Sequence, residues 1–224
     1  FDVRARVAQL LNLELGQIKV VASEIGGGFG GKTTVYLEPV ALILSKKSGR
    51  PVKMEMSRGD VFRASGPASA SQSRIKVGAK MDGTITAMQA TLHYEAGAFQ
   101  GSPMGPGCMT VFTPYDVENL YVEGFDVVVN KPKVAAYRAP GAPQSEFAAE
   151  MAVNELAKKI GMDPIEFRLK NAAKEGTQTI YGPKLKVVGL EACLEAAKSS
   201  PHYTAPIPEN VGRGLAAGFW FNIG

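Results

Sequence analysis

Hydrophobic residues recur at helical spacing in several segments of the chain. In the first of these, Val3, Val7, Leu10 and Leu11 lie on one face of a predicted helix. The same spacing predicts helices at residues 3–12, 33–47, 144–160 and 190–198, and a further helix begins at 163. We expect Pro39 to interrupt the second of these helices, because proline lacks the backbone N–H that a helix interior requires.

Other segments alternate between apolar and polar positions, which is typical of half-buried strands. The clearest region is residues 69–99, where two alternating runs flank Asp82 and Gly83, a strong hairpin signal. Further strands are expected at residues 17–23, 51–57, 121–130 and 215–221, and a Gly- and Pro-rich loop is expected at 97–107. The pattern predicts an α+β fold with a mixed, largely antiparallel sheet and packed helices.

Composition excludes few functions, but it bears on the binding partners, metal sites and cellular compartment to expect. The 25 basic and 21 acidic residues give a net charge of +4, which does not indicate nucleic-acid or membrane binding. No apolar run reaches the roughly 20 residues of a membrane span. Neither Cys108 and Cys193 nor His93 and His202 have the spacing of a metal site, so we expect no protein-ligated metal. A reducing cytoplasm is the simplest compartment for such a chain.

The two ends of the sequence suggest a piece of a longer polypeptide. Phe1 stands within a predicted helix, and Gly224 follows directly on a predicted strand. Domain boundaries usually carry more polar and flexible residues than these. We therefore expect residues 1–224 to be a fragment, and if it divides into two subdomains, the boundary should lie near 60–70.

A glycine-rich loop at residues 26–33, with the sequence GGGFGGKT, permits two interpretations. It satisfies the G-x-x-x-x-G-K-T pattern of a P-loop, which predicts a nucleotide-binding ATPase. Against that alternative, no apolar strand ends in a magnesium-binding Asp, and Pro39 would break the helix behind the phosphates. In the second interpretation, the absence of Cβ atoms lets the loop backbone approach an anionic or oxo ligand closely.

Three motifs carry a family resemblance. Residues 24–32 read EIGGGFGGK, residues 136–144 read AYRAPGAPQ, and residues 163–171 read DPIEFRLKN. Together and in this order they resemble the molybdopterin-binding large subunit of the xanthine dehydrogenase and aldehyde oxidase family. The acidic residues of the third motif, Asp163 and Glu166, are interpreted as helix-capping residues, with Glu166 closing a capping box.

The resemblance implies a molybdenum hydroxylase that acts on an aldehyde or N-heterocycle, a small-molecule substrate. Gly27, Gly28, Phe29, Gly30 and Arg138 would contact the molybdopterin, and Arg138 would also be catalytic. Gln144, by the same match, would lie close to the site. The resemblance further places iron–sulfur clusters and FAD on other subunits or domains, and a catalytic Glu in the rest of the large subunit. We therefore expect the isolated chain to be inactive.

Four positions are assigned to the substrate pocket by the same resemblance: Thr33, Pro106, Ala139 and Pro140. Purine-oxidising members carry a Glu where this chain has Thr33 and an Arg where it has Pro106. A site that lacks such polar contacts discriminates against purines, which argues against xanthine. Carbon monoxide dehydrogenases of the family carry a Cys at the position of Ala139, which argues against that branch.

Overall fold

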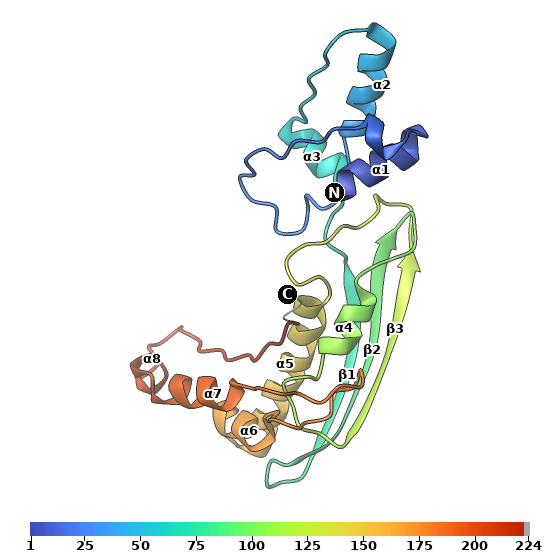
Figure 1. Ribbon diagram of the computed structural model, residues 1–224. Coiled ribbons are helices and arrows are strands. Elements are labelled where there is room, and N and C mark those ends of the chain that lie inside the picture. The colour runs from blue at the N-terminus through green and yellow to red at the C-terminus, as the bar shows by residue number, and fades with distance from the viewer. Residues whose placement is uncertain (222–224) are drawn as a thin grey trace.

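The computed structural model describes residues 1–221. Its helices and strands form two groups (Figure 1), one built from α1 to α3 and the other from the sheet and α4 to α8. The helices are α1 (Asp2–Leu11), the short 3₁₀ helix η1 (Leu15–Gln17), α2 (Glu38–Ser48), α3 (Arg58–Ala64), α4 (Met104–Thr110), α5 (Ala142–Ile160), α6 (Pro164–Asn171), α7 (Leu190–Ser199) and α8 (Pro201–Thr204). None of the helices in this described part is long and apolar enough to span a membrane.

The sheet has three strands in the order β1 (Ser71–Ala79), β2 (Ile85–Gly97) and β3 (Asn119–Val128). β1 and β2 form an antiparallel hairpin, whereas β3 pairs with β2 in parallel. At the hairpin turn the Asp82 Oδ1 accepts from the Thr84 N–H at 2.9 Å, and Gly83 has a φ of 87°. The predicted hairpin and the α+β class with a mixed sheet are confirmed.

One face of the sheet is covered by α4 and α5, which pack against it (Figure 1). The core lies between the sheet and these helices, because the inward residues of β2 alternate along the strand and join one buried cluster with the apolar residues of α5. Its fully buried members include Leu92, Tyr94, Phe112, Val153 and Phe167. The α5 helix ends where predicted, at Gly161, which adopts the left-handed conformation at φ 71°.

The third sequence motif, residues 163–171, stabilises the fold through hydrogen bonds at both ends of α6. Asp163 caps α6 by accepting from the N–H groups of Ile165 and Glu166 at 2.8 and 3.1 Å. Asn171, at the other end of α6, accepts from the Ile85 N–H at 2.8 Å and so holds the hairpin. The expected capping box does not form, because the Glu166 carboxylate instead pairs with Lys198 of α7 at 2.6 Å.

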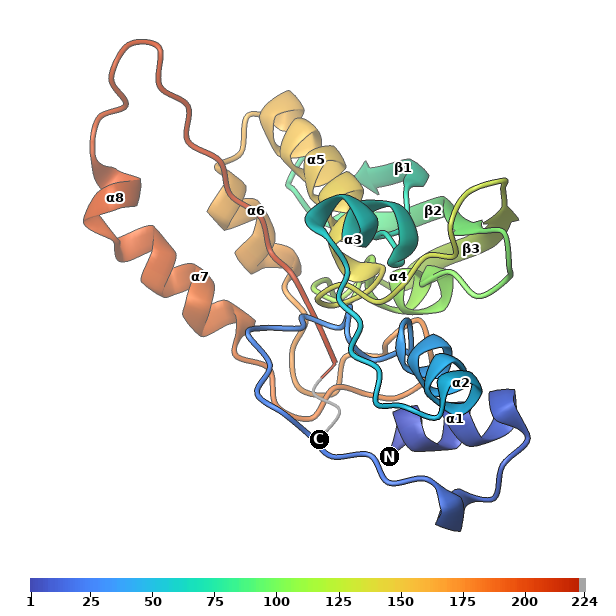
Figure 2. The same cartoon turned by 90° about the horizontal axis from the view of Figure 1, so that it is seen from above.

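A buried ion pair joins α5 and α6. The Arg168 guanidinium, with a residue exposure of 0%, donates to the Glu150 Oε2 from Nε at 3.0 Å and from an Nη at 2.6 Å. Glu150 also accepts from the hydroxyl of buried Tyr115. The segment after α8 returns beside α6 (Figure 2), and there the Ala217 N–H donates to the Glu150 Oε2 at 2.6 Å.

Several local predictions were wrong. Residues 17–23, 51–57 and 215–221 form no strands, because none of them finds a partner strand among residues 1–221. The second helix is not kinked: α2 begins at Glu38, which places Pro39 in its first turn, where proline is tolerated. Part of the expected loop at 97–107 is helical, since α4 begins at Met104.

The first group of helices has a small core of its own. Val7, Ala8 and Ile18 are buried together, and α2 contributes no fully buried residue to it. Several apolar side chains of α2 are more than 40% exposed, namely Val40, Leu42, Ile43 and Leu44.

Candidate cofactor-binding site

The glycine loop adopts backbone conformations that most residues avoid. Gly27 and Gly30 have φ values of 113° and 96°, and Phe29 between them has a φ of 50°. A positive φ at a bulky aromatic residue is strained, and such strain is common at ligand-binding sites. The loop turns on itself through the Gly31 N–H, which donates to the Gly28 carbonyl at 2.8 Å. Phe29 is 62% exposed, and its ring lies beside Gly27, where an added Cβ would come within 2.9 Å of the ring.

The second motif is strained in the same way. Arg138 and Ala139 have φ values of 22° and 54°, and Gly141 has a φ of 92°. Consecutive non-glycine residues at positive φ persist only where the surroundings fix them. This segment leads directly into α5, whose first residues are Ala142 and Pro143.

The structure brings these two motifs together, although they are far apart in sequence. The Arg138 N–H donates to the Phe29 carbonyl at 2.7 Å. A Cβ atom added to Gly30 would lie 3.0 Å from the Ala136 carbonyl oxygen, so the two backbones touch where only glycine fits easily. The strained residues of both motifs thus form one continuous surface.

Tyr94 and α4 pack against the second motif and hold its backbone in place. The Tyr94 hydroxyl donates to the Gly141 carbonyl at 2.6 Å, and burial raises the pKa of Tyr94 to about 12. A Cβ on Gly141 would lie 2.2 Å from the Pro103 carbonyl oxygen, and one on Gly107 would lie 2.4 Å from the Tyr94 hydroxyl. These contacts seat the start of α4 directly against the turn that follows Arg138.

Gln144 has an unusual half-satisfied amide. Its Nε2 donates to the Ser69 carbonyl at 3.2 Å, while its buried Oε1 has no hydrogen-bond partner within residues 1–221. Buried polar atoms without a partner are rare, and each one calls for a physical explanation. The atom lies on the first turn of α5, close in sequence to the strained residues.

The four predicted substrate-pocket residues are placed on these same segments. Ala139 and Pro140 are half-buried beside Arg138, and Pro106 is half-buried on α4. Thr33 is exposed at the end of the glycine loop, and its hydroxyl donates to the Gly30 carbonyl at 2.7 Å. Pro106 therefore lies on the helix that supports the second motif, whereas the hydrogen bond of Thr33 is made within its own loop.

The loop does not have P-loop geometry. A P-loop presents its N–H groups to phosphate and runs directly from a strand into a helix. Here the N–H groups of Gly31 and Thr33 donate to carbonyls of the loop itself. No strand precedes the loop, and α2 begins only at Glu38. The phosphate-binding alternative is therefore not supported.

The surface does fit a ligand that the backbone must approach closely. The N–H groups of residues 26–30 donate to no acceptor among residues 1–221. Within the loop, a Cβ added at Gly27 or Gly30 would lie only 2.9 Å from the Phe29 ring or 3.0 Å from the Ala136 carbonyl oxygen. Oxygen acceptors, such as those that molybdopterin carries, would satisfy these free N–H groups. In the described part of the chain, no cluster of His, Cys, Asp and Glu could hold a bare metal ion.

Known proteins similar to this chain include molybdopterin-binding and molybdenum-binding subunits of dehydrogenases. The nicotinate dehydrogenase large molybdopterin subunit of Eubacterium barkeri is 34% identical over 201 residues, which cover 87% of this chain and 47% of that protein. A putative xanthine dehydrogenase molybdenum-binding subunit of Escherichia coli is 33% identical, over 88% of this chain and 27% of that protein. The chain therefore spans about half the length, or less, of these curated relatives.

Solved structures agree with this result. The aldehyde oxidoreductase from Desulfovibrio gigas superimposes with a TM-score of 0.81 at 29% identity, over 87% of this chain and 22% of that one. A family model described as the molybdopterin cofactor-binding domain matches residues 1–172, which include the glycine loop, the Arg138 segment and all of α6. The chain therefore belongs to the molybdopterin cofactor-binding domain family.

Proposed function

We propose that this chain forms part of the cofactor cradle in the large subunit of a molybdenum hydroxylase. The observation that carries the proposal is the 2.7 Å hydrogen bond between the Arg138 N–H and the Phe29 carbonyl. This bond joins the two strained motifs, and the N–H groups of residues 26–30 have no acceptor within residues 1–221. When bound, the molybdenum cofactor supplies the redox chemistry by which a substrate carbon is hydroxylated.

The residues of this chain would bind and orient. The backbone of Gly27, Gly28, Phe29 and Gly30 would pack against the molybdenum end of the cofactor, and the exposed Phe29 ring would exclude water from it. The Arg138 guanidinium would donate to an oxygen on which negative charge develops.

We propose an aldehyde or a non-purine N-heterocycle as the substrate. Ala139 and Pro140, half-buried next to Arg138, offer apolar surface rather than hydrogen bonds. Pro106 and Thr33 stand where purine-oxidising members carry charged groups, and neither can replace a carboxylate or a guanidinium. A purine would then leave its polar atoms unpaired, which costs binding.

The remaining parts of such an enzyme would lie outside this chain. We propose that electrons pass to iron–sulfur clusters and then to a flavin on other subunits or domains, and that the assembly works in the cytoplasm. We also propose a subdomain boundary near residues 60–70. The small core around Val7 and the large core around Leu92 share no buried residue, and α3 ends at Ala64 between them.

The test compares two alanine variants of the full-length enzyme at equal molybdenum content. Arg138→Ala should lower the rate about 100- to 1000-fold, since one lost transition-state donor typically costs about 2.7–4 kcal/mol. Lys32→Ala is the control, because in this proposal Lys32 follows the loop without contacting a phosphate. Near-normal activity of Arg138→Ala together with an inactive Lys32→Ala would refute the assignment.

A further inference from the structure

Residues 214–221, which we call the C-terminal strap, run along α5 and are held there by three side chains. The Phe219 N–H donates to the Glu146 Oε1 at 3.0 Å, and the Ala217 N–H donates to the Glu150 Oε2 at 2.6 Å. One turn further along α5, the Asn154 Nδ2 donates to the Leu215 carbonyl at 3.0 Å. Every second residue of the strap is thus bonded to every fourth residue of the helix.

This pattern follows from matching repeats. Residues four apart in a helix are separated by about 6 Å along its axis. Residues two apart in an extended strand are separated by about 6.6 Å. Polar side chains at 146, 150 and 154 can therefore take the place of a neighbouring strand for one edge of the strap.

The other edge of the strap is free. In an extended chain the backbone groups of successive residues point to opposite edges. The exposures also alternate, as expected of an extended chain: Leu215, Ala217 and Phe219 are half-buried, whereas Ala216 and Gly218 are exposed. Within residues 1–221, the N–H groups of Ala216 and Gly218 find no hydrogen-bond acceptor.

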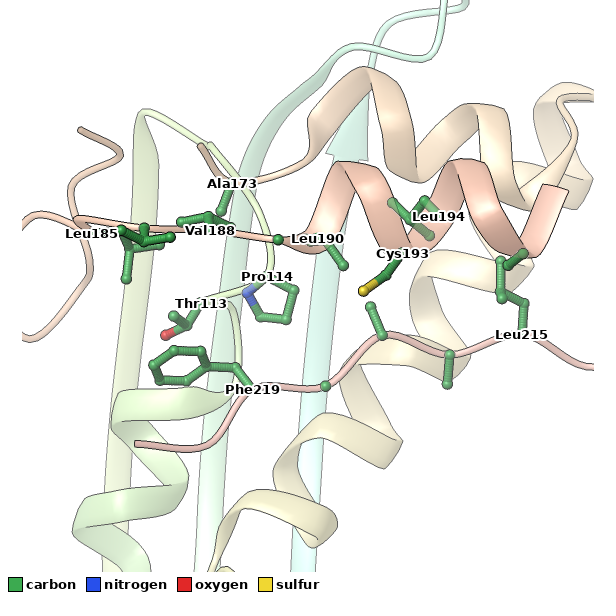
Figure 3. A pocket seen from close by; sticks show the side chains of 16 residues that line it. Thr113, Pro114, Ala173, Leu185, Val188, Leu190, Cys193, Leu194, Leu215 and Phe219 are labelled. Carbon is green, nitrogen blue, oxygen red and sulfur yellow. The ribbon is translucent and has the colours of Figure 1, made fainter. Parts of the chain in front are cut away.

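Apolar hollows lie on both sides of the strap. Figure 3 shows one of about 490 Å³, where Leu215 and Phe219 of the strap line the space together with Leu190 and Leu194 of α7. On the α5 side, a groove of about 590 Å³ includes Phe147 and Met151, which are 70% and 47% exposed. A strand added to the free edge could place alternate side chains in the hollow beside α7.

We infer that the strap is an unpaired β-strand, and that its free edge receives a β-strand from a further part of the same molybdopterin-binding subunit. Two findings favour that occupant. The match to the cofactor-binding family ends at residue 172, before the strap. The relatives also contain much more polypeptide, because the chain spans 47% and 27% of the two described above.

Such pairing would also stabilise the candidate site. Glu146 lies two residues after Gln144, on the turn of α5 that follows the Arg138 segment. A paired strap would hold this turn in place. The inference concerns the pairing of the strap and not the chemistry at the site, so it can hold or fail independently of the proposed reaction.

Hydrogen–deuterium exchange at single-amide resolution tests the inference, by comparing the 224-residue chain with the full-length subunit. The amides of Ala217 and Phe219 should be protected in both. Those of Ala216 and Gly218 should exchange on the order of 100-fold more slowly in the full-length subunit, since a paired amide must first open. Equal rates in the two proteins would overturn the inference. Protection that appears in the 224-residue chain as its concentration rises would identify a second copy as the occupant, and would also overturn it.

Two variants of the full-length subunit show whether any protection comes from strand pairing. Ala216→Pro removes one N–H from the free edge and should abolish the protection of the Gly218 amide. Ala216→Val keeps that N–H and should preserve it. If protection survives in the proline variant, the strap is covered without being paired, and the inference is wrong. Should the proline variant not fold, the comparison of the unaltered proteins still decides.

Discussion

Replacing Arg168 with leucine tests whether the buried ion pair holds the second group of elements together. The Arg168 and Glu150 side chains are 1% and 6% exposed, so the substitution leaves a carboxylate almost without water. Of its hydrogen bonds, only those from Tyr115 and the Ala217 N–H would remain. Breaking a buried pair by removing one partner typically costs about 3–5 kcal/mol, and we expect Arg168→Leu to fall in this range.

Urea denaturation of the 224-residue chain measures the free energy of unfolding. The control is Lys170→Leu on the same helix, because Lys170 pairs with Asp82 at 3.6 Å with both side chains well exposed. Exposed pairs contribute about 0–1 kcal/mol, so this control should change stability little. The double variant Glu150→Leu/Arg168→Leu should be more stable than Arg168→Leu, since it no longer buries an unpaired charge. A single variant as stable as the control, or a double variant that is less stable than the single one, would show that the buried ion pair does not hold these helices together.

Two further predictions concern α5 and the segment before it. Burial raises the pKa of Glu146 from its ordinary 4.5 to about 7, helped by the Glu150 charge and opposed by the Phe219 N–H. The folded state then binds the proton more tightly than the unfolded state, so this stabilisation is complete below about pH 4.5 and is lost as the pH rises towards 7. Unfolding curves at several pH values should show a flatter profile for Glu146→Gln, and parallel profiles would contradict the prediction. Tyr94→Phe removes the hydrogen bond to Gly141 and should cost about 1 kcal/mol in the same assay, whereas an equal loss for the exposed Tyr121→Phe would argue against a specific role.

Local sequence signals predicted those parts of the fold that depend on neighbouring residues. The β1–β2 hairpin follows from Asp82 and Gly83, and the end of α5 follows from Gly161, because a glycine or a tight turn acts within a few residues. Pro39 was misjudged, since a proline that would break a helix interior is tolerated in a first turn. The segments at 17–23 and 51–57 have strand patterns, but a strand also needs a partner, which the pattern does not supply.

The site itself was predictable only in part. The motifs containing Phe29 and Arg138 could be recognised by resemblance, but no periodicity predicts that their backbones touch. Tyr94 was missed, because a tyrosine in a strand gives no signal that its hydroxyl will reach Gly141. Arg168 was missed as well, since a charged residue on a short helix is usually solvated, and its partner lies on another helix.

If the glycine loop and the Arg138 segment form a cofactor cradle, disturbing their contact should lower the cofactor content of the enzyme. Gly30 and Gly49 have φ values of 96° and 65°, so alanine strains the backbone at both positions, by roughly 1–2 kcal/mol for a left-handed residue. A Cβ at Gly30 presses on the Ala136 carbonyl, whereas one at Gly49 meets open space. Molybdenum and molybdopterin are measured per polypeptide in the full-length subunit carrying each substitution. We expect Gly30→Ala to lose most of both while Gly49→Ala keeps the unaltered content; full occupancy in Gly30→Ala would show that this contact does not form part of a cofactor cradle.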